Sequence, residues 1–95
     1  MIVDIAWWDL PESGIGLERL RADLTERRLR QWREVEGLSA KLWLADPRRG
    51  RWGAVMLWDR PPDPELLPPN RALELIGAAP THRVRFDVAA VVRGR

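Results

Sequence analysis

Arg28 and His82 are the side chains of this sequence most suited to chemistry at a small-molecule site. Helical spacing places Arg28 in the middle of an apolar stripe, between Leu24 and Trp32. A guanidinium fixed there would bind an anionic or phenolate ligand; in the alternative interpretation, its stem covers apolar surface while the charge reaches water. His82 is the only histidine, and histidine is the side-chain type best suited to acid–base chemistry at neutral pH, so it is either a general base or a solvated turn residue.

Four further residues complete a predicted ligand pocket around Arg28. Trp7 and Trp32 would supply flat apolar walls, as small-molecule pockets have, although plain core packing is the simpler interpretation of both. Asn70 and Arg71 follow a proline-rich run and would lie at the pocket rim. Capping of a short helix is the alternative role of Asn70. The predicted pocket therefore consists of Trp7, Arg28, Trp32, Asn70 and Arg71, with Arg28 and His82 as the candidate catalytic residues.

Several kinds of chemistry are excluded by composition. The chain has no cysteine, so thiolate catalysis, disulfides and zinc–thiolate sites are impossible, and one histidine cannot form a multi-histidine metal site. No Ser-His-Asp order, phosphate loop or dinucleotide-binding glycine pattern is present. We therefore expect no metal and no cofactor. Sixteen basic against fourteen acidic residues give a net charge of only +2, which does not favour nucleic-acid binding.

The elements that would position these residues form one domain over residues 1–95, because 95 residues leave no room for two cores. β-Branched and aromatic runs predict strands, and 3.6-residue periodicity predicts helices. In chain order these are a strand over 2–8, a helix over 17–35, a hairpin of strands 38–46 and 51–59 with Asp46 opposite Arg51, a proline-rich segment over 60–70, a helix over 71–76 and a strand over 83–92. This order predicts an α+β, ferredoxin-like βαββαβ fold with a four-stranded antiparallel sheet and two helices on one face.

Strand alternation sorts the sheet residues into two faces. The first set is wholly apolar and is expected beneath the helices: Val3, Ile5, Trp7, Leu38, Ala40, Leu42, Leu44, Val55, Leu57, Val84, Phe86, Val88 and Ala90. The second set is rich in tryptophan, and as an exposed patch it would mark a partner surface. We therefore expect a homodimer whose interface contains Asp4, Trp8, Lys41, Trp43, Trp52, Met56, Trp58, Arg85 and Asp87.

The hairpin sequence is similar to that of a known family. Residues 36–43 (EGLSAKLW) and 52–58 (WGAVMLW), together with Phe86-Asp87-Val88, resemble the corresponding segments of the YdhR-type monooxygenases. These belong to the dimeric α/β-barrel superfamily, in which two ferredoxin-like protomers join their sheets. The resemblance implies a homodimer and cofactor-independent oxygenation. The chain departs from the pattern at Glu36, where the family often has proline, and in its proline-rich 60–70 segment, so the pocket rim and substrate are not implied.

Three functions follow as hypotheses. The first is a dimeric small-molecule-binding protein that oxidises a phenolic or polycyclic substrate without a cofactor. The second is a non-catalytic assembly or binding module whose pocket is filled by side chains. The third is RNA binding, because RNA-recognition domains share this element order, but Ala54 occupies a position where a stacking aromatic is expected. No apolar run is long enough to span a bilayer and no signal peptide is recognisable, so we expect a soluble, cytoplasmic protein without nucleic-acid or membrane partners.

Overall fold

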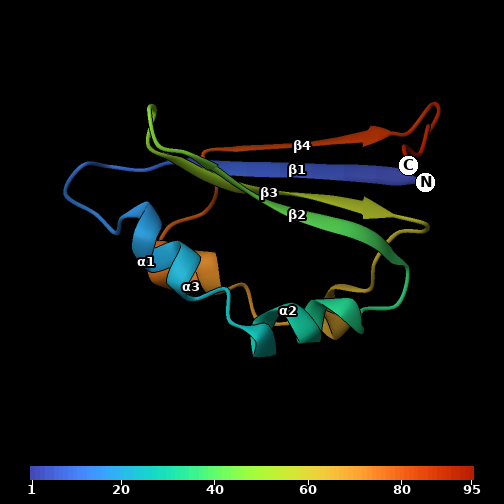
Figure 1. The fold of residues 1–95 in the computed structure, drawn as a ribbon, viewed down its shortest axis with the longest axis horizontal. Coiled ribbons are helices and arrows are strands. Elements are labelled where there is room, and N and C mark those ends of the chain that lie inside the picture. The colour runs from blue at the N-terminus through green and yellow to red at the C-terminus, as the bar shows by residue number, and fades with distance from the viewer.

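The computed structural model describes residues 1–95, arranged as one sheet with helices on one of its sides (Figure 1). The elements in chain order are β1 (Ile2–Asp9), α1 (Leu17–Ala22), α2 (Glu26–Arg33), β2 (Leu38–Asp46), β3 (Arg51–Trp58), a 3₁₀ turn η1 (Pro64–Leu66), α3 (Arg71–Ile76) and β4 (His82–Asp87). No helix has the length and apolar character needed to cross a membrane.

The sheet confirms the predicted fold class. Its four antiparallel strands have the order β2-β3-β1-β4, which is the ferredoxin-like arrangement. The predicted hairpin register is also correct, because Asp46 pairs with Arg51 across β2 and β3. Asp46 stabilises the turn between these strands, since its carboxylate accepts hydrogen bonds from the backbone N–H groups of Arg48 and Arg49 at 3.1 and 3.2 Å.

Two predicted boundaries are wrong. The helix expected over 17–35 is divided into α1 and α2, because α1 ends at its C-cap Asp23 and a new helix begins after the N-cap Thr25. Thr25 has extended backbone and its hydroxyl accepts the backbone N–H of Arg28 at 3.3 Å, which begins α2. The last strand ends at Asp87, five residues before the predicted end at Val92.

The short helix α3 agrees with prediction at both of its ends. Asn70 accepts a hydrogen bond from the backbone N–H of Leu73 at 3.0 Å, so its expected capping role is confirmed. Gly77 ends the helix with φ of 81°, a left-handed conformation that glycine adopts at little cost. The helix therefore carries Arg71 in its first turn at a fixed position beneath the sheet.

The assignment of the two sheet faces is reversed. Helices α1, α2 and α3 cover the tryptophan-rich face, where Trp8 and Trp52 form a buried cluster with Leu20 of α1. Most of the apolar set lies on the opposite, uncovered side, where Leu42 and Phe86 are 52% and 55% exposed. The exceptions are Leu38, which pairs with Trp58 at a register shift, and Val88 and Ala90, which follow the end of β4. Most of the predicted interface residues, such as Trp8 and Trp43, therefore lie on the face that the chain's own helices cover.

Candidate ligand cavity

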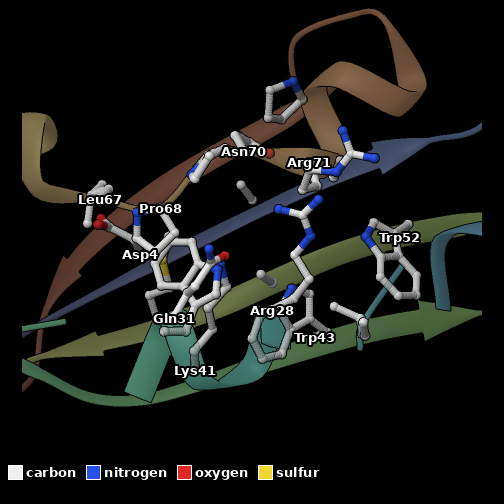
Figure 2. A pocket seen from close by; sticks show the side chains of 18 of the residues that line it. Asp4, Arg28, Gln31, Lys41, Trp43, Trp52, Leu67, Pro68, Asn70 and Arg71 are labelled. Carbon is white, nitrogen blue, oxygen red and sulfur yellow. The ribbon is translucent and has the colours of Figure 1, made fainter. Parts of the chain in front are cut away.

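A cavity of about 470 Å³ lies between the helix layer and the tryptophan-rich face of the sheet. The sheet supplies its floor, α2 and the end of α1 supply one wall, and the proline-rich segment with α3 supplies the other (Figure 2). The aromatic and sulfur-containing floor residues are Trp8, Trp43, Trp52, Met56 and Trp58. The short helices leave this space open, because they cannot cover the whole sheet.

Two buried indole rings of the floor, those of Trp8 and Trp58, differ in their hydrogen bonding. Trp8 is 6% exposed, and its Nε1–H donates to the carbonyl oxygen of Ala78 at 2.8 Å, which fixes the ring against the segment after α3. Trp58 is completely buried, yet its Nε1–H has no hydrogen-bond partner. A buried donor without an acceptor is costly and rare in folded proteins. The Trp58 indole therefore carries an unsatisfied donor that is itself closed off from the cavity.

A cluster of cations surrounds a single carboxylate at one end of the cavity. Asp23, at the C-terminal cap of α1, accepts hydrogen bonds from Arg71, with the closest contact at 3.1 Å. The guanidinium groups of Arg28 and Arg19 each lie 3.9 Å from the same carboxylate. Arg71 also contacts Glu74, and these hydrogen bonds raise its pKa above the ordinary value. The Asp23 carboxylate thus lies near three arginines but accepts hydrogen bonds only from Arg71. No carboxylate is hydrogen-bonded to the Arg28 guanidinium.

Lys41 lies in the cavity floor on β2, between aromatic rings. Its Nζ is 3.2 Å from the ring centroid of Trp32 and 4.7 Å from that of Trp43, and no carboxylate lies within salt-bridge distance. Burial removes water from the amine and lowers the pKa of Lys41 from 10.5 to about 7. A substantial fraction of this amine is therefore uncharged at neutral pH.

The remaining acidic residue of the cavity is neutralised within the sheet. Asp4 on β1 pairs with Arg85 on β4 through two hydrogen bonds of 2.6 and 2.9 Å. These bonds raise the pKa of Arg85. The pair adds no net charge to the cavity, so the positive character comes from the Arg28 end, from Arg83 on β4 and from any protonated fraction of Lys41.

The structure brings together four of the five predicted pocket residues. Arg28, Trp32, Asn70 and Arg71 all line the cavity. Trp7 does not line it, because this residue belongs to the uncovered face of the sheet.

His82 is separated from Arg28 and does not line the cavity. Its ring stacks on Trp7 with centroids 4.6 Å apart, and its Nε2 lies 3.2 Å from a carboxylate oxygen of Asp9. The two candidate catalytic residues therefore do not share a site.

The cavity residues that sequence reasoning assigned to a dimer interface include Trp8, Lys41, Trp43 and Trp58. One signal for Lys41 was available: it is the only lysine among sixteen basic residues. No such signal was available for the tryptophans, because a tryptophan at every second strand position produces the same sequence pattern whether its face is exposed or buried.

Comparisons with known proteins do not assign a function. No model of a known protein family matches the chain. No curated protein is significantly similar to it. The geometry of the cavity is therefore the basis for the functional proposal.

Proposed function

We propose that this protein binds an aromatic small molecule with an anionic group in the cavity between its sheet and its helices. The observation that carries the proposal is a 470 Å³ cavity floored by indole rings, with Arg28 at its wall and no carboxylate hydrogen-bonded to that guanidinium. Small-molecule sites combine apolar walls with a few polar groups in this way.

Binding of 2-naphthoate, a two-ring carboxylate, tests this proposal by isothermal titration calorimetry. Replacing Arg28→Gln removes the charge-assisted hydrogen bond and should weaken binding by about tenfold or more. Arg30→Gln is the matched control, because Arg30 is an exposed arginine of the same helix and does not line the cavity. No binding by the wild type, or equal loss in both variants, would refute the proposal.

The proposed assembly is a homodimer formed through the uncovered apolar face. Two copies related by a twofold axis place the same patch against itself, so the patch must be complementary to itself. An apolar face without a charged side chain at its centre can pack against a copy of itself, because no like charges are brought together. Exposed side chains such as Leu42 and Phe86 would then be removed from water. The resemblance to dimeric α/β-barrel proteins supports the same arrangement.

Light scattering coupled to size-exclusion chromatography tests the dimer. Leu42→Glu places a charge in the middle of the apolar face and should yield monomers. Leu66→Glu is the control, because Leu66 is 70% exposed in η1, away from that face. A wild-type monomer, or dimers that survive Leu42→Glu, would exclude this interface.

The resemblance to YdhR-type monooxygenases extends the proposal to cofactor-independent oxidation of a phenolic substrate. In such a reaction the bound phenolate supplies electrons to oxygen, one oxygen atom enters the substrate, and the other leaves as water with two hydrogens from the substrate. Arg28 would stabilise the phenolate. Oxygen consumption with a panel of hydroquinones, above the rate without protein and lost in Arg28→Gln, is the expected result. Binding without turnover would favour a non-catalytic binding module.

A further inference from the structure

Lys41 combines features that are not needed merely to bind an anion. It is the only lysine of the chain, and it lies on the edge strand β2, in the cavity floor rather than on the outer surface. The other fifteen basic residues are arginines, whose guanidinium groups are not nucleophilic at neutral pH. The chain thus has one side-chain amine, and that amine faces the proposed ligand.

The surroundings of this amine favour reactivity. The rings of Trp32 and Trp43 lie beside its Nζ and limit its contact with water. Figure 2 shows Lys41 in the same part of the cavity as Gln31 and Arg28 of α2. The charged residues that line this cavity are Asp4, Asp23, Arg28, Arg71, Arg83 and Arg85. Both carboxylates among them are hydrogen-bonded to arginines, so neither holds the amine in its charged form.

We infer that Lys41 is a nucleophilic amine that forms a reversible imine with an aromatic aldehyde or ketone bound in the cavity. The nitrogen lone pair forms a bond to the carbonyl carbon while the carbonyl π electrons move to oxygen, which takes up a proton. The carbinolamine then loses water, a proton leaves nitrogen, and a C=N bond replaces the C=O bond. No oxidant or reductant is consumed. Imine formation at Lys41 depends on the proposed binding function, and it requires that the bound ligand carry an aldehyde or ketone group.

The lowered basicity of the amine supports this chemistry. With a pKa of about 7, roughly half of Lys41 is free base at neutral pH. An ordinary lysine has a free-base fraction about a thousandfold smaller at that pH. The same effect, desolvation in an apolar pocket, activates lysines for imine formation in general.

Reductive trapping of 6-formyl-2-naphthoate tests the inference, because this aldehyde carries the same anionic ring system as 2-naphthoate. The protein is incubated with the aldehyde and cyanoborohydride at pH 7 and then digested with trypsin. Modification blocks cleavage after Lys41, so the adduct appears on an uncleaved peptide of residues 34–48. Excess 2-naphthoate should suppress this adduct but not an adduct on the amino group of Met1.

Variants and denaturation supply the controls. Lys41→Arg keeps a positive charge but removes the nucleophile, so it should form no adduct at position 41 while the adduct on the amino group of Met1 remains. Denaturing the wild type in urea should nearly abolish the Lys41 adduct, because the amine regains its ordinary basicity. The adduct in the folded protein should rise with pH around a midpoint near 7.

The two proposals fail in different ways. If 2-naphthoate binds but the aldehyde is trapped only on Met1, the imine inference is overturned and the binding function stands. If the aldehyde labels folded and denatured protein equally at Lys41, the inference is also overturned. If 2-naphthoate does not bind and no adduct forms at Lys41, both proposals are wrong.

Discussion

Replacing Lys41→Met should stabilise the folded protein, and the gain should depend on pH. Methionine keeps an unbranched stem of similar length among the rings of Trp32 and Trp43 but carries no charge. Above about pH 10.5 the lysine is neutral in both the folded and the unfolded chain, so the amine adds no penalty. As the pH falls, the unfolded chain takes up the proton first, and stability decreases until the folded chain is protonated near pH 7.

The size of this effect follows from the pKa change. A decrease from 10.5 to about 7 corresponds to a penalty of about 4 to 5 kcal/mol, at roughly 1.4 kcal/mol for each pH unit. At pH 10 the unfolded amine is still mostly protonated, so about 1 kcal/mol of this penalty remains there. We therefore expect the advantage of Lys41→Met to be about 2 to 4 kcal/mol larger at pH 7 than at pH 10.

Urea denaturation followed by tryptophan fluorescence measures this difference at equal protein concentration. The chain contains no tyrosine and no cysteine, so Lys41 is the only side chain with an ordinary pKa between those of histidine and arginine. The terminal amino group is present in both proteins, and its contribution cancels in the comparison. Parallel stability curves for wild type and Lys41→Met between pH 7 and pH 10 would refute the placement of Lys41 in a desolvated cavity.

Three substitutions test other parts of the fold. Gly53→Ala should cost about 3 kcal/mol or prevent folding, since an added Cβ would collide with backbone of β1, whereas Gly16→Ala meets no atom within 4 Å and should change urea stability little. Trp8→Phe removes the hydrogen bond to Ala78 and should cost about 1 kcal/mol beyond the lost packing, measured by urea denaturation. Asn70→Ala removes the N-cap of α3 and should lower stability by about 1 kcal/mol in the same assay.

The hairpin could be predicted from sequence because its signals are local. Pro47 and Gly50 define a turn of four residues, and alternation on both sides then fixes Asp46 opposite Arg51. The division of the first helix is less accessible, since periodicity from Leu17 to Val35 continues across the break. Only Thr25, a good N-cap residue within that run, indicates a restart.

The choice of sheet face could not be made from alternation. Alternation separates residues such as Ile5 and Trp8 but does not say which set the helices cover. Because amino acids are chiral, the face toward which a strand side chain points is linked to the edge toward which its backbone N–H points. The face that the helices cover therefore depends on which residues of β1 hydrogen-bond to β3 and which hydrogen-bond to β4. Apolar character alone favours the wholly apolar set as the covered face, and this expectation is wrong for most of its residues.

The observed arrangement has a physical reason that concerns polar atoms. Side chains on the covered face combine a large apolar body with a polar end, such as the indole of Trp43 or the amine of Lys41. A polar end needs a partner when it is buried, and an incompletely filled layer can admit one in the form of a ligand. Leu42 and Phe86 on the uncovered face have no such need. A second chain can exclude water from them without leaving a hydrogen bond unmade, so the two faces suit ligand binding and self-association respectively.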